Sequence, residues 1–582
     1  MSDPRIIRVS GALAEAVGLT QASLYELVQV GSKGLLGEVI RLDGDRGVIQ
    51  VYEDTTGLRV GEPVRMTGSA LTVHLGPGLL GSILDGVGRP LAAVAEQSGD
   101  FIQPGISAET LDSTRRWRFK PLRKSGDEVG GGDVLGTVEE RPGIAHRVLV
   151  PPGVAGRLAR LDGGDYTVLD PIGELADGTP LRLAQAWSVR QPRPSAERLP
   201  AERPFVTGQR VFDFLFPVSE GGSVAVPGGF GTGKTVIEQA LAKYAEADIV
   251  VYIGCGERGN EMAEVLNEFP KLVDPHSGRS IMDRSVLVVN TSNMPVAARE
   301  SSVYLGITIA EYYRDMGYRV AVMADSLSRW GEALREIAAR LQEMPGEEGY
   351  PTYLGNRLGK FYERAGRVRA LGQPERNGVL TLISAVSPPG GDFSEPVTQA
   401  SLRVAGALWA LDPALAHQRQ FPAVDWETSY SLHAERTAPW FAEHAGPEWP
   451  GLRRDTLELL QRERELREIA GLIGPEALQD KDRLLLEAAR LVRETVLAQS
   501  AFDPNDALSP VAKTYRLALL ARAAYQAGLA ALDRGALFDR LNLTPIRRAI
   551  AAVRWSAPGD LDARVTEAQL AVQQITGTGA AA

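Results

Sequence analysis

The chain has 582 residues, of which 44% are hydrophobic and 23% charged, a composition typical of a globular protein with a large core. At roughly 100–200 residues per domain, this length predicts about three to five domains. The 63 basic and 73 acidic residues give a net charge of -10. This balance argues against a general nucleic-acid-binding surface, which requires clustered Lys and Arg.

Cysteine and apolar patterns restrict the cellular setting. Cys255 is the single cysteine, so no disulfide can form within the chain and the fold does not depend on an oxidising compartment. The six histidines lack the spacing of a zinc site. The N-terminus has no secretory pattern, and no run of about 18 uncharged apolar residues predicts a membrane span. We therefore expect a cytoplasmic protein that reaches a membrane only through partners.

The first third of the chain is predicted to be rich in β-structure. Residues 1–70 contain short apolar, β-branched runs separated by Gly/Asp turns, a pattern that favours a small N-terminal β-barrel. Residues 71–110, which include a glycine-rich connecting loop at 75–92, are interpreted as a connector and the start of a nucleotide-binding domain. Residues 111–190 are rich in Gly, Pro and Val and predict a separate β-rich insert.

Residues 191–434 predict a domain with alternating strands and helices. Its compact apolar runs are typical of strands that are buried on both faces of a parallel sheet. They lie at 223–227, 248–254, 285–290, 319–325 and 378–386, and helix-length segments separate them. We expect an open α/β sheet with right-handed crossovers.

Residues 435–582 predict a helical C-terminal domain. Apolar residues recur there at three- and four-residue spacing in segments 452–470, 480–499 and 511–534. The last residues, 576–582, are small and polar and are expected to be disordered. The predicted fold is thus a multidomain α/β protein with a β-barrel, a β-rich insert, a P-loop nucleotide domain and a helical end.

A complete phosphate-binding loop lies between the strand at 223–227 and the next helix. It fits the pattern G-x-x-x-x-G-K-[ST] with Gly228, Gly229, Phe230, Gly231, Thr232, Gly233, Lys234 and Thr235. Its glycines allow backbone N–H groups to surround a phosphate, and the helix N-terminus adds partial positive charge. Lys234 is expected to contact the β- and γ-phosphates of ATP, and Thr235 to offer its hydroxyl to Mg²⁺. The alternative is a glycine-rich turn that happens to end in Lys-Thr.

Two acidic residues follow other predicted strands. Asp325 ends the run 319–325 and is expected to bind Mg²⁺ through water, although it could also cap the helix that begins at 326. Glu257 lies three residues past the strand 248–254 and is predicted to polarise the attacking water. Its neighbour Arg258 could reach the γ-phosphate; the alternative is a surface Glu-Arg pair in a loop.

These features share one position in the predicted sheet. The P-loop, Glu257, Asp325 and the loop 387–392 all follow the carboxyl ends of strands. Ligands of open α/β sheets bind outside these ends. The sequence therefore predicts a single nucleotide site at that edge.

Several longer motifs resemble the catalytic A subunit of V-type and A-type rotary ATPases. They are GGFGTGKT, GCGERGNEM, the stretch 323–354, SPPGGDFSEPVTQ and PAVDWETSYS. The resemblance covers nearly the whole chain, and the β-rich insert corresponds to the extra region of these A subunits. It implies ATP hydrolysis or synthesis coupled to H⁺ or Na⁺ transport.

The resemblance also implies roles for individual residues. Lys234 and Thr235 would handle the phosphates and Mg²⁺, Glu257 would activate water, and Arg258 would contact the γ-phosphate. Phe230 would lie near the nucleotide, and Phe421 would pack on adenine, unless it is a core aromatic beside Pro422. The chain departs from its relatives at Leu508, where a tyrosine often lines the adenine pocket, and at Thr232, where eukaryotic vacuolar relatives carry cysteine.

By the same resemblance the chain would form an alternating ring of three A and three B subunits. The noncatalytic B subunit would supply an arginine finger, worth about 10³–10⁵ in rate. Central-shaft subunits, a peripheral stalk and a membrane sector that translocates ions would complete the complex. The chain is therefore expected to be cytoplasmic and peripherally associated with a membrane, and to bind no nucleic acid.

Three other functions compete with this interpretation. A homohexameric export or flagellar ATPase shares the chemistry but lacks the insert. A ring-shaped RNA translocase shares the fold, but the pI near 5.4 and the absence of an obvious basic-aromatic platform argue against it. A nucleotide-binding subunit without catalysis would not need Glu257 beside an intact P-loop.

Overall fold

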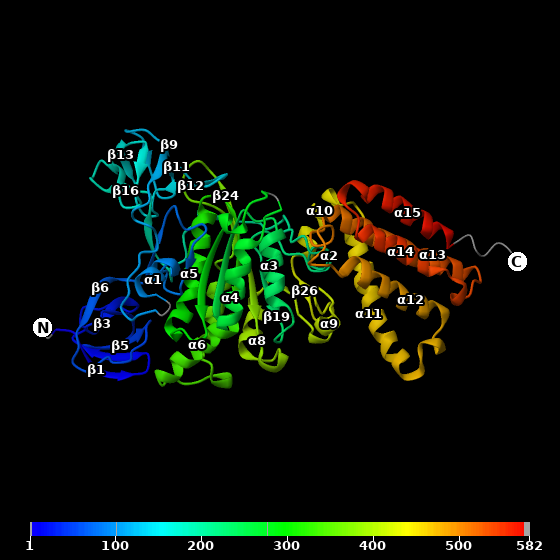
Figure 1. The fold of residues 1–582 in the computed structure, drawn as a ribbon, viewed down its shortest axis with the longest axis horizontal. Helices are drawn as coiled ribbons and strands as arrows, with labels where there is room; N and C mark the ends of the chain where they lie inside the picture. Colours follow the sequence, from blue (N-terminus) through cyan, green and yellow to red (C-terminus); the bar gives the residue numbers. More distant parts are fainter. Residues whose placement is uncertain (1–2, 100–101, 276, 576–582) are drawn as a thin grey trace. The chain divides into compact units, whose positions relative to one another are not determined.

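The computed structural model describes residues 3–99, 102–275 and 277–575. The predicted disorder at 576–582 lies outside these residues. The chain divides into two compact units (Figure 1). The first unit contains residues 1–200, 220–225 and 247–405, and the second contains residues 201–219, 226–246 and 406–582.

The first unit begins with an antiparallel sheet of six strands in the order β1-β2-β5-β4-β3-β6. The strands are β1 (Arg5–Ser10), β2 (Leu13–Val17), β3 (Glu26–Val30), β4 (Leu35–Asp43), β5 (Arg46–Val51) and β6 (Val64–Ala70). Val64 N–H donates to Pro4 O at 2.9 Å and Arg5 bridges Pro63, so the two edges of the sheet meet. Ile6, Val28 and Ile49 are fully buried in the core. The predicted N-terminal barrel is confirmed.

The insert consists of two four-stranded antiparallel sheets, with strand orders β10-β13-β15-β16 and β12-β11-β9-β14. Their strands are β9 (Trp117–Pro121), β10 (Glu128–Val129), β11 (Val134–Arg141), β12 (Ile144–Leu149), β13 (Gly156–Leu161), β14 (Gly164–Tyr166), β15 (Pro171–Leu175) and β16 (Pro180–Arg182). β17 (Gln185–Ser188) then returns to pair with β7 (Thr72–Leu75). A β-rich module at this position was the prediction.

The glycine-rich segment that we interpreted as a connecting loop contains regular structure. β8 (Ile83–Leu84) pairs in parallel with β21 (Ser285–Thr291), and α1 (Leu91–Ser98) follows it. A strand of two residues is too short to leave a periodic pattern in the sequence. Its pairing with a strand about 200 residues away depends on the tertiary structure.

A parallel sheet forms the centre of the first unit. Its strands lie in the order β24 (Asn377–Val386), β22 (Arg319–Asp325), β20 (Ile249–Glu257), β21 and β8, and the first residues of β19 (Ser223–Pro227) lie beside β24. An antiparallel strand, β23 (Gly366–Arg369), also joins β24 and pairs with β18 (Glu197–Leu199). The helices of this part are α4 (Gly259–Glu268), α5 (Val296–Asp315), α6 (Leu327–Arg340), α7 (Leu354–Tyr362) and α8 (Pro396–Val404).

The strands of this sheet are buried on both faces, as their apolar runs predicted. Every residue of β20 is buried, and β24 is buried from Gly378 onward. Residues on opposite faces of a strand can both be apolar only where helices or other layers cover both sides. The expected α/β nucleotide domain is confirmed, while the predicted domain boundaries stay predictions.

The second unit is largely helical. It contains α2 (Arg210–Leu215), α3 (Lys234–Tyr244), β25 (Ala407–Leu408), α9 (Pro413–His417), β26 (Tyr430–Ser431), α10 (Ala434–His444), α11 (Trp449–Ile473), α12 (Asp480–Leu491), a π-helical turn (Val492–Leu497), α13 (Val511–Asp533), α14 (Leu543–Arg554) and α15 (Leu561–Gln574). The predicted C-terminal helical domain is thereby confirmed. Over the ranges that the structure describes, no helix is long and apolar enough to cross a membrane.

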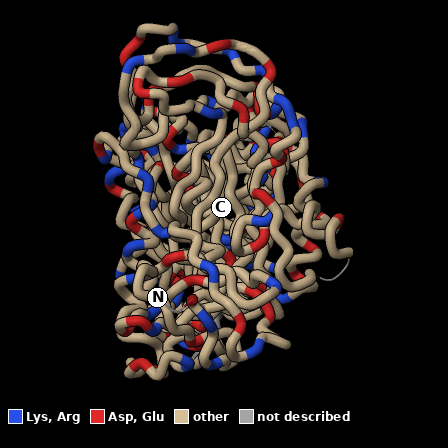
Figure 2. The backbone as a smooth tube through the Cα atoms, turned by 90° about the vertical axis from the view of Figure 1, so that its left-hand side faces the viewer, with Lys and Arg blue, Asp and Glu red and all other residues tan. Residues whose placement is uncertain are grey.

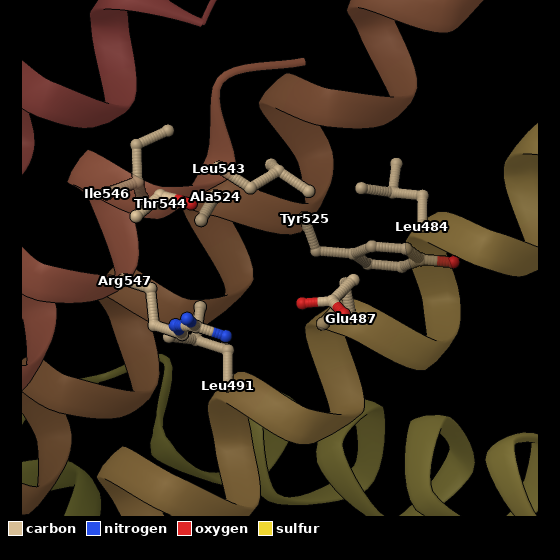
Figure 3. Close-up of a pocket in the computed structure, with 10 residues that line it drawn as sticks. Leu484, Glu487, Leu491, Ala524, Tyr525, Leu543, Thr544, Ile546 and Arg547 are labelled. Atoms are coloured by element: carbon tan, nitrogen blue, oxygen red, sulfur yellow. The ribbon is translucent and has the colours of Figure 1, made fainter. Parts of the chain in front are cut away.

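The packing of the C-terminal helices includes a small cavity. A mostly apolar cavity of about 50 Å³ lies among α12, α13 and α14, with Leu484, Leu491 and Ile546 among its walls (Figure 3). The charged Glu487 and Arg547 also line it. Along the backbone, the basic residues (Lys and Arg) and the acidic residues (Asp and Glu) are intermingled (Figure 2).

Candidate nucleotide site

The P-loop connects the end of β19 to the start of α3. Gly231 and Gly233 adopt φ values of 76° and 89°, a region that favours glycine. Gly233 occupies the N-cap position of α3, where it carries no side chain that could satisfy the first N–H groups of the helix. The loop therefore presents backbone donors and a helix N-terminus to any anion that approaches it.

The lysine of this loop is held against the loop's own carbonyl groups. Lys234 Nζ donates to Gly228 O at 2.8 Å and to Gly229 O at 2.9 Å. Thr232 Oγ1 donates to Gly229 O at 2.8 Å. A Cβ at Gly228 would come within 2.9 Å of Leu411 Cβ, so that position has no room for a side chain. The ammonium group is thus fixed beside the loop at which phosphates would bind.

The donors of this segment fit a phosphate and a hard cation. Thr235 lies in the first turn of α3, where its hydroxyl is an oxygen ligand of the kind that Mg²⁺ prefers. Within the described ranges no cluster of three or more His, Cys, Asp or Glu could hold a metal by itself. A cation here would need phosphate oxygens as further ligands, which is the usual pattern for magnesium at nucleotides. Phe230, at the tip of the loop, is 77% exposed.

Two carboxylates lie at the carboxyl edge of the parallel sheet in the first unit. Gly254 of β20 is paired with Asp325, the last residue of β22. β20 then continues to Glu257, so this residue ends the strand rather than following it by three residues as we expected. Glu257 is 9% exposed and Asp325 is 4% exposed. Strand register thus brings both predicted acids to the same edge.

Burial changes the acidity of Glu257. Removal from water, together with the negative charge of Asp325, raises the pKa of Glu257 to about 8. A hydrogen bond with Glu261 acts in the same direction. A carboxyl group with a pKa near neutrality can take a proton from water more readily than an ordinary glutamate. Such perturbed groups concentrate at functional sites.

Asp325 does not cap the following helix. α6 begins at Leu327, and Ser326 occupies its N-cap position. The Tyr252 hydroxyl donates to Asp325 Oδ2 at 3.4 Å, which orients the carboxylate from the neighbouring strand. The capping alternative is therefore wrong, and the carboxylate stays at the strand end.

Arginines surround this edge. Arg258 is half-exposed at the N-cap of α4, and its Nε lies 4.0 Å from Glu261. Arg329, in the first turn of α6, was missed by our reasoning from sequence. Burial lowers the pKa of Arg329, but its hydrogen bond and ion pair with Glu332 at 2.9 Å, and to a smaller extent the charge of Glu257, raise that pKa overall. The sequence contained a signal for Arg329, because this residue lies four positions after Asp325 in the family-like stretch 323–354.

The loop that follows β24 is attached to the same region. Ser387 N–H donates to Ser328 Oγ in α6 at 2.8 Å. The ends of β20, β22 and β24 are consequently neighbours in the first unit, as the positions of the motifs predicted. Asp392, at the far end of this loop, is exposed and binds Ser394 N–H.

The second unit contains the residues expected at adenine. Phe421 is half-buried, so it is not a fully enclosed core residue, and its carbonyl accepts from Gln499 N–H at 2.8 Å. The Gln499 side chain also donates to Gly208 O and Ala507 O. Leu508 packs against Gly208, where an added Cβ would lie 2.4 Å from Leu508 Cδ1. Phe502, on the same segment, is 98% exposed.

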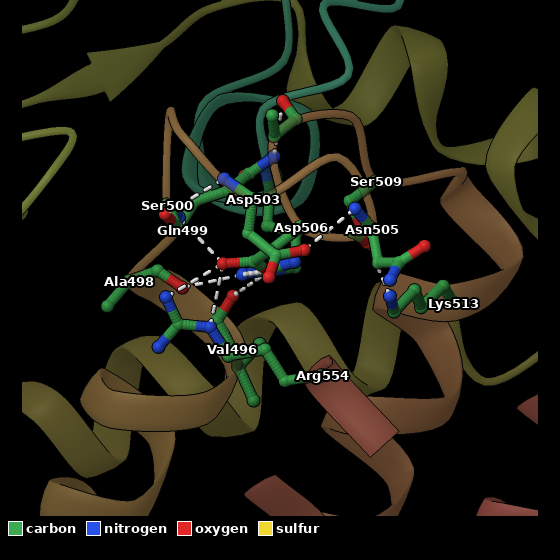
Figure 4. Close-up of polar contacts among 12 residues, drawn as sticks. Val496, Ala498, Gln499, Ser500, Asp503, Asn505, Asp506, Ser509, Lys513 and Arg554 are labelled. Carbon is green, nitrogen blue, oxygen red and sulfur yellow. Dashed lines mark hydrogen bonds and ion pairs between the residues drawn. The ribbon is translucent and has the colours of Figure 1, made fainter. Parts of the chain in front are cut away.

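A buried polar network holds the segment 498–509 in place (Figure 4). Arg210 donates to the carbonyls of Val496 and Ala498, and Asp506 pairs with both Arg210 and Arg554. Lys513 Nζ donates to Asn505 O at 2.8 Å and to Ser556 O at 3.2 Å. Helices α2, α13 and α14 thereby fix the segment that lies beside Phe421.

Comparison with known proteins identifies the family. The ATP synthase alpha/beta family model for the nucleotide-binding domain matches residues 208–431, and the model for its barrel-sandwich domain matches 108–190. The β-barrel domain of that family matches residues 6–68, and the C-terminal domain of V and A type ATP synthase matches 438–540. The chain is also 58% identical over 512 residues to the V-type ATP synthase alpha chain of Anaeromyxobacter dehalogenans (strain 2CP-1), covering 88% of each chain.

The chain belongs to the catalytic A subunits of V-type and A-type ATP synthases. The corresponding A subunit of the A-type ATP synthase of Methanosarcina barkeri is 52% identical to it over 565 residues, covering 97% of each chain. The catalytic subunit of this family couples ATP to ion transport, so the predicted function is confirmed.

A structural comparison shows the shared fold. The assembled ATPase EscN from the type III secretion system of enteropathogenic E. coli matches 89% of this chain and 100% of its own, with a TM-score of 0.63. At 22% sequence identity, this likeness shows the fold alone. The identities to V-type and A-type chains therefore decide against the export ATPase alternative.

Proposed function

We propose that this catalytic chain hydrolyses or forms ATP as its magnesium complex, with Lys234, Thr235, Glu257, Arg258 and Asp325 in the active site. The observation that carries the proposal is the burial of Glu257 beside Asp325 at the ends of adjacent strands. A buried carboxyl group with a raised pKa suits a general base, and a second carboxylate beside it suits water-mediated contact with a divalent cation.

Each residue acts through its own chemistry. Lys234 holds the β- and γ-phosphates, together with the backbone N–H groups of residues 228–233 and the N-terminus of α3. Glu257 orients the attacking water and takes its proton as the water oxygen bonds to the γ-phosphorus and the bond from that phosphorus to the bridging β–γ oxygen breaks, so that ADP leaves. Arg258 stabilises charge on the γ-phosphate. In the synthetic direction the same groups hold ADP and phosphate and return the proton.

A bound magnesium ion would supply positive charge against the negative charge of the phosphates. The residues that would hold it are Thr235, through its hydroxyl, and Asp325, through water. Both supply hard oxygen donors, and neither belongs to a described cluster that could bind a metal by itself. This explains why the cation would arrive together with the nucleotide.

Recognition of the base is assigned to the second unit. Phe421 would pack on adenine, and Phe230 would lie near the nucleotide. The half-burial of Phe421 and its backbone contact with Gln499 support this assignment. Leu508 packs beside Gly208, so it offers an apolar contact in place of a phenol hydroxyl. We expect weaker discrimination between adenine and other bases than a tyrosine would give.

The chain would work in an alternating ring of three A and three B subunits. A noncatalytic B subunit would supply the arginine finger, and the C-terminal helices would act on central-shaft subunits. A peripheral stalk and a membrane sector would couple rotation to H⁺ or Na⁺ transport. The chain would thus lie on the cytoplasmic side, attached to the membrane through its partners.

Isolation of the native complex tests this assembly. The protein is purified from its own cells under native conditions, and the identity and stoichiometry of its partners are measured by mass spectrometry. We expect three copies of this chain with three copies of a relative that lacks a complete P-loop. Recovery as a homohexamer would reject the alternating ring while leaving the residue roles to the activity measurements. Rapid ATP hydrolysis by the isolated chain would contradict the need for an arginine from the partner.

A further inference from the structure

A second cavity, distinct from the one among the C-terminal helices, lies in the first unit; it opens to solvent and shares no lining residue with the proposed nucleotide site. Its volume is about 690 Å³, within the range of small-molecule sites. It is lined by the barrel at Tyr25, by the segment 190–198, by α5 and by α7. Seven of its lining side chains are cationic and two are carboxylates.

The inner wall consists of three buried arginines whose carboxylate partners are already engaged. Arg364 donates to both oxygens of Glu311, which also accepts from the backbone N–H of Arg193. Arg193 Nε donates to Asp315 Oδ2 at 2.7 Å, and Arg314 donates to Asp315 Oδ1 at 2.8 Å. Glu311 and Asp315 hold the arginines in place, and the carboxylate oxygens of these two acids already accept hydrogen bonds.

The remaining cations lie closer to solvent. Arg190 is held by Glu38 and Glu300, and Arg357 donates to Glu300 at 2.9 Å. Lys360 is exposed, and Arg198 is exposed and donates to the carbonyl of Glu363. Two carboxylates, Glu311 and Glu363, line the cavity, and three more, Glu38, Glu300 and Asp315, pair with its arginines. Five acids therefore oppose seven cations. The cavity therefore keeps an excess of positive charge.

One donor on this wall has no acceptor. The Arg193 side chain is 1% exposed, and Nη1 has no hydrogen-bond partner among the atoms that the structure describes. Its other nitrogens are used, since Nε binds Asp315 and Nη2 donates to Gln185 at 3.3 Å. The guanidinium lies over the rings of Trp187 and Tyr312, at 4.8 and 5.3 Å from their centroids, which favours the buried charge. A buried N–H without an acceptor still costs free energy, because it has lost its hydrogen bond to water. Arg193 is one of the lining residues, so its positive charge acts on any anion in the cavity.

We propose that this cavity binds a compact oxyanion of the phosphate or diphosphate class. Arginine favours these groups because its planar N–H donors match the spacing of their oxygens. Several fixed cations and an excess of positive charge are the features of a site prepared for a multivalent anion. The ligand could be free phosphate or diphosphate, or the phosphate tail of a nucleotide, and the test below separates these sources.

The test uses the full chain with Lys234→Ala, so that the P-loop contributes little phosphate binding. Pyrophosphate is titrated calorimetrically in the presence of a chelator, which removes metal complexes. We expect one saturable site, and Lys360→Glu in the same background should weaken binding roughly tenfold, because an attractive charge becomes a repulsive one. Lys124→Glu, an exposed lysine in the insert, is the matched control and should leave binding unchanged.

One further variant and one competitor complete the test. Arg193→Gln should also weaken binding, and Lys360→Glu keeps the proposal falsifiable if the buried variant does not fold. Displacement of pyrophosphate by ADP with an affinity that depends on Lys360 would identify the nucleotide tail as the source. Failure of ADP to compete would identify the free anion. Absence of pyrophosphate binding, or binding that ignores both Lys360 and Arg193, overturns the proposal.

Discussion

Arg210 and Asp506 form an ion pair of 2.7 Å in which both side chains are fully buried. Burial lowers the pKa of Arg210 to about 10, because the loss of water outweighs the attraction of Asp506. Asp506 also binds Arg554 at 2.8 Å. One carboxylate thus pairs with two arginines and anchors the segment beside Phe421 to helices α2 and α14.

Replacement of this carboxylate should destabilise the second unit strongly. Asp506→Asn would leave the buried Arg210 without a counter-charge, and the expected loss is about 3–5 kcal/mol in the free energy of unfolding. Urea unfolding followed by circular dichroism measures this loss. Arg203→Gln is the control, because it breaks the exposed Arg203–Glu246 pair and should cost about 0–1 kcal/mol. Equal effects of the two variants would contradict the importance of burial.

Lys513 should make the stability of the second unit depend on alkaline pH. Burial lowers the pKa of Lys513 to about 8, whereas an unfolded lysine titrates near 10.4. Between these values the unfolded chain binds more protons, so stability rises with pH. Relative to Lys513→Met, the natural chain should gain up to about 3 kcal/mol in unfolding free energy from pH 7 to pH 10.

The same unfolding measurement at four pH values between 7 and 10 checks this prediction. The difference between the two proteins isolates Lys513 from other groups that titrate in this range. Lys481→Met provides the control, because Lys481 is exposed and its pKa is raised by Asp533, so it should show no gain over that range. A flat difference for Lys513 would show that it keeps its proton when folded.

Glu257→Gln should retain nucleotide and nearly abolish turnover. The amide preserves size and polarity but cannot accept a proton from water, and the loss should be about 10²–10⁴-fold in kcat. ATPase activity of the assembled complex and fluorescence titration with a nucleotide analogue measure the two properties separately. Glu264→Gln, an exposed position on α4, should behave like the natural protein. Normal turnover by Glu257→Gln would reject its role as the base.

Lys234→Ala should weaken both nucleotide binding and catalysis. The ammonium group lies against the P-loop carbonyls, so its removal takes the fixed positive charge away from the phosphate-binding loop. Isothermal titration with ADP should show affinity reduced by at least about tenfold, which corresponds to about 1.4 kcal/mol. Lys243→Ala, at the other end of α3, serves as control. Unchanged affinity in Lys234→Ala would count against the assigned loop.

Local sequence was sufficient to predict the elements that carry the chemistry. β19 and β22 have the bounds that their apolar runs predicted, because such runs and their glycine or acidic neighbours are short-range signals. The P-loop was recognisable because its chemistry requires particular residues at fixed spacing. Asp325 was likewise predicted at the end of its strand.

Properties that depend on distant contacts could not be predicted in the same way. The extension of β20 to Glu257 depends on pairing with β21, and the raised pKa of Glu257 depends on burial and on Asp325. Arg329 was missed because its relation to Glu257 exists only after α6 has packed beside β20. β8 was assigned to a loop because its partner strand lies far along the chain.

The sequence by itself determined the order of the domains, the phosphate-binding loop and the family motifs, because each is encoded in contiguous residues. Only the tertiary structure decided which strands are neighbours, which carboxylates lose their water and which arginines gather around the second cavity. Pairing, burial and charge excess arise from residues brought together across the whole unit, and no single stretch of sequence contains that information.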